Sequence, residues 1–267
     1  MRKFLLFLFL ISFISSAHSE LKIKIQKAEI GALPIIISIK GDSEIFSSKN
    51  FSSIIENDLY GSGYFNILDS SKIKTSIKNT NTQYALWTLA GANFLLKASI
   101  IRDEEYEFIK FNLHDVVKKN IMFSYKIRLS KKSSERKIAH TISNLIFEEI
   151  TGIKGVFDTK IAYISTENKE NRKIYKLHVA DIDGFNSVAI YKSSKQLMSP
   201  TWSPKNDKIA YVSFENNRPE IFIQTLATGE RKKLLEGNNS NSAPAWSPDG
   251  KFIAYTSSVK GNLEIFI

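Results

Sequence analysis

The chain has 267 residues, no cysteine and a formal net charge of +10 at pH 7. The absence of thiols excludes disulfides, zinc–cysteinate sites and cysteine catalysis, so packing alone must stabilise the fold. The positive charge suits nucleic acid, an anionic membrane face or an acidic partner, but the lysines are spread along the chain. Because no dense basic run with interleaved aromatic residues occurs, we expect no nucleic-acid partner.

Residues 1–19 have the three parts of a secretory signal. A charged start is followed by an apolar run at residues 4–14 and by small residues at positions 17 and 19. We expect cleavage between Ser19 and Glu20, and therefore an exported protein. The apolar run is shorter than the roughly twenty residues that a membrane span needs, and no second run of that kind follows.

Residues 20–150 mix strand-like and helix-like patterns, which predicts a small α/β domain. The first segment alternates apolar and polar side chains and reads as a strand with one apolar face. It comprises Glu20, Leu21, Lys22, Ile23, Lys24 and Ile25. A continuous apolar run at 35–39 suits a buried strand. Helices are predicted at 51–60, with Gly61 as the stop, and at 83–90.

The second half of this segment predicts a hairpin and a helix. Residues 106–113 and 121–129 alternate with period two, and residues 116–120 join them. Apolar residues at helical spacing follow at 138–150. Residues 151–159 contain two glycines and read as a linker.

Two histidines, His114 and His140, are the obvious candidates for acid–base chemistry. Neither lies in a sequence pattern that pairs a nucleophile with a base, and no Gly-x-Ser-x-Gly, His-Glu-x-x-His or phosphate-binding glycine loop occurs. We therefore interpret both as core or surface histidines, and we expect no catalytic residue, no cofactor and no metal.

The last third of the chain repeats itself after 44 residues. Trp202-Ser203-Pro204 recurs as Trp246-Ser247-Pro248, and the two strand-like segments that follow it recur with the same offset. Short strands separated by turn residues, repeated every 40–45 residues, are typical of β-propeller blades. Residues 160–267 therefore predict an all-β propeller of which about two and a half blades are present.

Two features of the blades have both a structural and a functional interpretation. Trp202 and Trp246 could stack a ligand, but a position that repeats in each blade is more often core. Asp181-Ile182-Asp183-Gly184 resembles the start of a calcium loop, yet Phe185 and Lys192 occupy positions where ligands are required. A tight turn is the favoured interpretation.

The order of signal, α/β domain and propeller resembles the TolB family of the Tol-Pal system. The resemblance covers essentially the whole chain, and its most specific stretches are 58–65, 138–140, 151–152, 197–204 and 223–229. The resemblance implies that the protein is a non-enzymatic adaptor in the periplasm. It also implies a monomer without a membrane span.

The resemblance also implies two partners. The segment after the signal peptide, Glu20 to Ile25, would engage the inner-membrane protein TolA. The propeller mouth would bind the peptidoglycan-associated lipoprotein Pal through loops just before the repeated tryptophan. These loops are Met198, Ser199 and Pro200 in one blade, and Asn241, Ser242, Ala243 and Pro244 in the next.

The number of blades leaves alternatives open. The resemblance implies a propeller of six blades, so we expect the chain to correspond to the amino-terminal portion of a longer protein. An exported serine oligopeptidase, with a catalytic domain beyond residue 267, is one alternative to the adaptor. An exported propeller that binds a sugar or metabolite is another.

Overall fold

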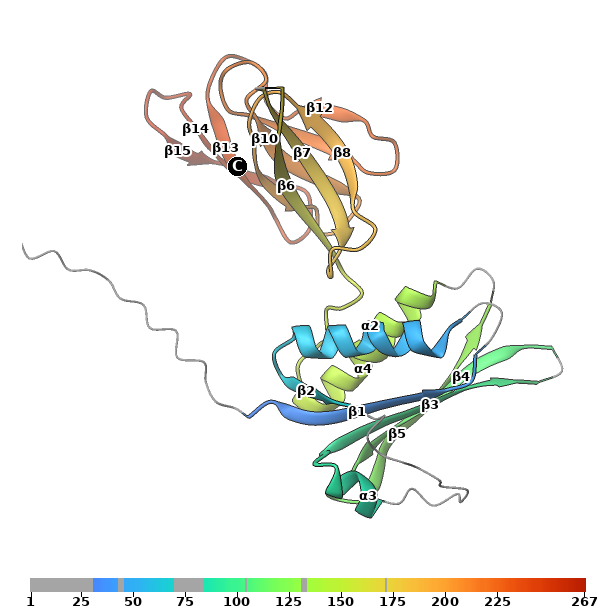
Figure 1. Ribbon diagram of the computed structural model, residues 1–267. Coiled ribbons are helices and arrows are strands. Elements are labelled where there is room, and N and C mark those ends of the chain that lie inside the picture. The colour runs from blue at the N-terminus through green and yellow to red at the C-terminus, as the bar shows by residue number, and fades with distance from the viewer. Residues whose placement is uncertain (1–30, 43–45, 70–83, 104, 131–133, 171) are drawn as a thin grey trace, which may run out of the picture. The chain divides into compact units, whose positions relative to one another are not determined.

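The computed structural model of the protein describes residues 31–42, 46–69, 84–103, 105–130, 134–170 and 172–267 (Figure 1). The predicted cleavage site at Ser19 and Glu20 and the predicted strand at residues 20–25 lie outside the described residues.

The first part of the described chain is built on a five-stranded mixed sheet. Its strand order is β2-β1-β3-β4-β5, with β1 parallel to both β2 and β3 and the remaining pairs antiparallel. The predicted hairpin at residues 106–129 is confirmed as β4 and β5. The strands are β1 (Leu33–Lys40), β2 (Phe65–Leu68), β3 (Phe94–Arg102), β4 (Glu107–Asp115) and β5 (Asn120–Leu129).

Two helices, α2 (Ser48–Gly61) and α4 (Glu135–Thr151), lie side by side on one face of this sheet (Figure 1). Their apolar stripes bury a core with the alternate residues of the strands, among them Ile55, Leu96 and Ile142. The end of α2 differs slightly from the prediction. Gly61 is its last helical residue rather than its stop, because the backbone turns at Ser62 and takes a positive φ only at Gly63.

A short helix, α3 (Tyr84–Leu89), confirms the predicted helix at 83–90. It covers part of the opposite face of the sheet. There Tyr84 and Trp87 pack against Ile36 and Leu95 in a second, smaller apolar cluster.

The segment between the helix α4 and the first strand of the blades is packed rather than loose. Gly152 ends α4 in the left-handed conformation at φ 72°, as helix C-termini commonly do. Phe157 then joins the core of the α/β sheet, and its N–H donates to Oδ1 of Asn144 over 2.8 Å.

The remaining chain forms three antiparallel sheets of neighbouring strands, as expected for the first blades of a propeller. The first blade has β6 (Lys160–Lys169), β7 (Arg172–Asp181) and β8 (Val188–Ser193). The second has β9 (Leu197–Trp202), β10 (Lys208–Ser213), β11 (Glu220–Thr225) and β12 (Arg231–Lys233). The third has β13 (Asn241–Trp246), β14 (Ile253–Ser257) and β15 (Glu264–Phe266).

The turn chemistry of the repeat is confirmed. The turn after each repeated tryptophan needs a residue with positive φ, and Asn206 at 57° and Gly250 at 71° supply it at matching positions. Asn and Gly are the residues that tolerate this backbone best. Within the described chain, no helix is both long and apolar enough to cross a membrane.

Candidate functional site

The predicted partner-binding residues of the propeller lie in strands, which corrects their assignment to loops. Met198, Ser199 and Pro200 belong to β9, and residues 241–244 begin β13. Each of these strands is the first of its blade and lies at an edge of its sheet. The two strands also contact each other.

Both strands contain the same irregularity. The pairing register shifts between Met198 and Thr201 in β9 and between Ser242 and Ala245 in β13. At this point Ser199 and Ala243 have positive φ angles of 50° and 51°. A strand that carries such an extra residue bends and re-aims the side chains beside it.

The side chains around this irregularity differ in exposure. Met198 is 42% exposed, and Ser199 and Ala243 are also on the surface. Asn241 and Pro244 are buried, so they can support a binding surface but cannot contact a partner directly.

The two repeated tryptophans differ in their surroundings, and only Trp202 is shown to pack against an apolar core of the described residues. Trp202 is partly buried and packs against the cluster that contains Leu197, Ile209 and Phe222. Trp246 is half-buried, and its indole N–H is buried without a hydrogen-bond partner among the described residues.

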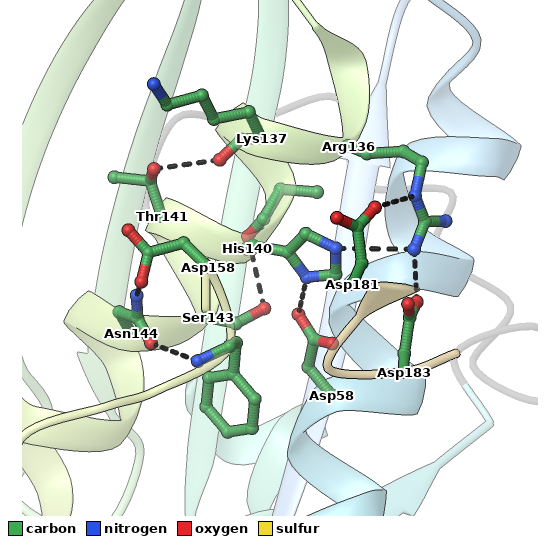
Figure 2. A network of polar contacts seen from close by, with 12 residues as sticks. Asp58, Arg136, Lys137, His140, Thr141, Ser143, Asn144, Asp158, Asp181 and Asp183 are labelled. Atoms are coloured by element: carbon green, nitrogen blue, oxygen red, sulfur yellow. Dashed lines mark hydrogen bonds and ion pairs between the residues drawn. The ribbon is translucent and has the colours of Figure 1, made fainter. Parts of the chain in front are cut away.

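A polar network that the sequence did not predict is centred on His140 of α4 (Figure 2). Its Nδ1 lies 2.8 Å from Oδ2 of Asp58 in α2, and both side chains are buried. Its Nε2 lies 3.3 Å from the guanidinium of Arg136, one helical turn earlier. Both ring nitrogens of His140 are thus engaged, one by Asp58 of α2 and the other by Arg136 of α4.

Arg136 extends the network to the turn that follows β7. Its guanidinium pairs with Asp183 and lies 3.9 Å from Asp181. Burial raises the pKa of the Asp183 carboxyl, but hydrogen bonds from the Phe185 N–H and from Arg136, and the charge of Arg136, outweigh it. The pKa of Asp183 is therefore lowered, and the carboxylate form is favoured.

This arrangement accounts for the Asp181–Gly184 motif without calcium. Asp181 accepts from Lys160 over 2.7 Å and from Asn186 over 2.8 Å, and Gly184 supplies the positive φ of a tight turn. Both carboxylates of the motif are thus bonded to cationic or amide groups. The described residues contain no cluster of three side chains able to hold a metal ion.

His114, the other candidate histidine, lies under α3. Its Nδ1 is 3.1 Å from the hydroxyl of Tyr84, and the side chain is 2% exposed. Burial, with a smaller effect of the Lys97 charge, lowers the pKa of His114, which favours the neutral imidazole of a core residue.

The second blade holds another network that sequence patterns missed. Arg231 donates to both carboxylate oxygens of Glu215 and to the hydroxyl of the buried Tyr211, and its guanidinium stacks on Phe222. Tyr191 of β8, in the first blade, also donates to Glu215 over 2.8 Å, so the packing of the two blades as well as the strand pairing brings the partners together. Because Tyr211 is buried and Arg231 and Glu215 are partly buried, we infer that these contacts stabilise the blade.

Comparisons with known proteins agree with this two-part architecture. A model of the TolB amino-terminal domain matches residues 21–122, and a model of the TolB beta propeller domain matches residues 147–267. The Tol-Pal system protein TolB of Coxiella burnetii is 37% identical over 245 residues, which are 88% of this chain and 55% of that protein. The corresponding protein of Hydrogenovibrio crunogenus is 36% identical over 234 residues, with 86% and 54% covered.

A solved structure gives the same result. The crystal structure of TolB from Acinetobacter baumannii matches with a TM-score of 0.74 and 32% identity, over 88% of this chain and 57% of that one. The chain spans about half the length of the curated relatives it matches. With the amino-terminal domain and the first propeller blades of TolB in the same order, the chain belongs to the TolB family.

Proposed function

We propose that the protein is a non-enzymatic periplasmic adaptor of the Tol-Pal system. It connects a TolA-like protein of the inner membrane with a Pal-like lipoprotein of the outer membrane, and so supports envelope integrity and outer-membrane constriction at cell division. The observation that carries the proposal is the tandem match to both TolB domains, together with relatives named as Tol-Pal system proteins.

The TolA-like partner is assigned to residues 20–25. Their strict alternation predicts a short strand with one apolar face, and such a segment could add to the edge of a partner's sheet. We expect export with cleavage between Ser19 and Glu20, which would put this segment at the free amino terminus of the mature protein.

We propose that the Pal-like partner binds at the irregular first strands of the second and third blades, β9 and β13. Met198, Ser199 and Ala243 are exposed there on edge strands whose bends recur with the blade repeat. A rigid surface that repeats from blade to blade suits a docking role. The buried Asn241 and Pro244 would support the backbone of this surface without contacting the partner.

Calorimetric titration of the whole purified protein with the soluble domain of the Pal-like lipoprotein tests this assignment. We expect micromolar or tighter binding, and at least tenfold weaker binding for Met198→Glu. The matched control is Val188→Glu in β8, which places the same charge at an apolar side chain that is 60% exposed. Equal binding by both variants would show that the Pal-like partner does not bind at β9. Absence of binding by the folded protein would refute the Pal-like partner altogether.

Deletion of residues 20–25 tests the other partner separately. We expect it to abolish binding to the periplasmic domain of a TolA-like protein and to leave Pal binding unchanged. Mass spectrometry of the protein from a periplasmic extract gives the start of the mature chain. An amino terminus at Glu20 supports export, whereas an intact Met1 would refute it.

A further inference from the structure

The face of the α/β sheet opposite α2 and α4 carries an array of cations. Strand alternation and register bring five side chains to this face, beyond the part that α3 covers. They are Lys40 of β1, Lys97 of β3, Lys110 of β4, and Lys126 and Arg128 of β5, and we call them the basic face. All five are exposed.

The pairing within the basic face is unfavourable for the fold. Lys110 and Lys126 lie directly opposite each other on neighbouring antiparallel strands. Lys40 continues the same row across the sheet, with only Ser99 between it and Lys110. Like charges directly opposite each other destabilise a sheet, so the fold alone gives no reason for this arrangement.

Few carboxylates compensate these charges. Within the described chain, none of the five cations forms an ion pair, although other lysines and arginines do. Among the described residues, Asp103 lies in the turn between β3 and β4, at one end of the array, where the charges of Lys126 and Arg128 help to lower the pKa of its carboxyl group. Counting the described residues alone, Lys40, Lys97 and Lys110 have no carboxylate in an ion pair with them, so this part of the basic face carries a net positive charge.

Aromatic and aliphatic side chains lie beside the cations. The ammonium group of Lys126 is 3.6 Å from the ring centre of Phe108, and the guanidinium of Arg128 is 3.4 Å from that of Tyr106. Ile101 is paired with Phe108 and is 38% exposed. Cations and apolar side chains thus lie next to each other on one face of the sheet. Protein surfaces that contact the headgroup region of a bilayer have a similar composition.

We propose that the basic face is a docking surface for an anionic phospholipid membrane. Four of the five cations are lysines, which act as point charges on flexible stems, and they are spread over the flat face of a sheet. An acidic protein segment is better recognised by arginine forks that bind carboxylates in pairs. Clusters of four to eight basic residues beside a membrane are typical of attraction to anionic lipids. This inference does not depend on the proposed binding of Pal or TolA.

Co-sedimentation with lipid vesicles tests the proposal. The probes are vesicles of phosphatidylethanolamine and phosphatidylglycerol in equal parts, and vesicles of phosphatidylcholine alone. The protein without residues 1–19 should bind the first at low ionic strength and not the second. Binding should disappear in about 1 M salt, where the Debye length falls to about 3 Å.

A triple variant identifies the surface. Lys97→Gln, Lys110→Gln and Lys126→Gln together should weaken binding about a hundredfold, since each cation near an anionic surface contributes about fivefold. The control is a triple variant with the same change in net charge, made at exposed lysines outside the sheet. It consists of Lys154→Gln, Lys173→Gln and Lys205→Gln, and it should weaken binding less than threefold.

A stability measurement separates binding from folding. Because the opposed charges of Lys110 and Lys126 are removed, the midpoint of thermal unfolding of the first triple variant should be equal to or above that of the parent. Equal loss of binding in both triple variants would refute the basic face as the docking surface. Failure of the folded parent to bind anionic vesicles would also refute the proposal, and retention on immobilised polyglutamate in that case would assign the face to an acidic protein.

Discussion

Ser199 and Ala243 lie 44 residues apart and have the same left-handed backbone, with φ angles of 50° and 51°. Each occupies the irregular point of the first strand of its blade, where the pairing register shifts. Neither side chain favours this conformation, which costs a non-glycine residue roughly 1–2 kcal/mol. The blade geometry, rather than the side chain, therefore dictates the backbone at this position.

Substitution of Ala243 tests this interpretation. Ala243→Gly should raise the free energy of unfolding by about 1 kcal/mol, because glycine adopts positive φ without a steric penalty. Ala243→Val should lower it by about 2 kcal/mol, because a β-branched side chain suits this backbone least. The control is Ala245→Gly in the same strand, where the φ is not positive and glycine should cost about 0.5–1 kcal/mol. Urea denaturation measures all three, and a loss of stability in Ala243→Gly would contradict the argument.

The buried pair of Asp58 and His140 joins the two helices that cover the sheet. Asp58→Ala should lower the free energy of unfolding by about 1–3 kcal/mol, because it leaves a buried imidazole N–H without an acceptor. Asp58→Asn keeps an oxygen that can accept from the imidazole N–H of His140, so it should lower the free energy of unfolding by less than Asp58→Ala does. A double-mutant cycle with His140→Ala should give a coupling energy of at least about 0.5 kcal/mol. Additive effects of the two substitutions would show that the contact contributes nothing to stability.

Local sequence patterns predicted most of the architecture. The hairpin at 106–129 and the helix at 138–150 follow from periods of two and 3.6 residues, which depend only on the chain nearby. The blades follow from the 44-residue repeat and its turn residues, such as Gly250. Patterns of this kind fix which elements form and which of their faces are buried.

The networks could not be predicted in the same way. Asp58 and His140 are 82 residues apart, and only the packing of α2 on α4 brings them together. The family resemblance implies a loop at 198–200, yet these residues, which include the turn-favouring Ser199 and Pro200, lie in the strand β9. An edge strand tolerates both a proline and an irregular register, so the turn-like residues describe a bend within the strand.

The close packing at Gly155 leads to a steric prediction. A Cβ atom added to Gly155 would lie 2.4 Å from Oδ1 and 2.7 Å from Cα of Asn144 in α4. Gly155→Ala should therefore lower the free energy of unfolding by about 1–3 kcal/mol, since the segment would have to move off the helix. The matched control is Gly61→Ala at the end of α2, where a Cβ meets no atom within 4 Å and should be neutral or slightly stabilising. Equal unfolding midpoints in urea for the two variants would show that residues 152–159 are not held against α4.

The ion pair of Glu215 and Arg231 predicts a specific dependence of stability on pH. Burial raises the pKa of Glu215, but hydrogen bonds from Arg231 and Tyr191, and the charge of Arg231, outweigh it and lower the pKa below the usual value of about 4.3. A carboxyl group with a lowered folded-state pKa stabilises the protein fully above its unfolded-state pKa. That contribution is lost as the pH falls through the folded-state value.

Glu215→Gln should thus be less stable than the parent by about 1–3 kcal/mol at neutral pH, because it leaves Arg231 partly buried without its counter-ion. The difference should shrink as the pH falls through the lowered folded-state pKa of Glu215, because the parent's own carboxylate then becomes protonated. Glu264→Gln is the control, since its side chain is 51% exposed and 4.0 Å from Lys260, and it should differ little from the parent at any pH. Urea denaturation at a series of pH values measures each difference. If the gap between Glu215→Gln and the parent were the same in acid as at neutral pH, the charge of Glu215 would not be what stabilises the second blade.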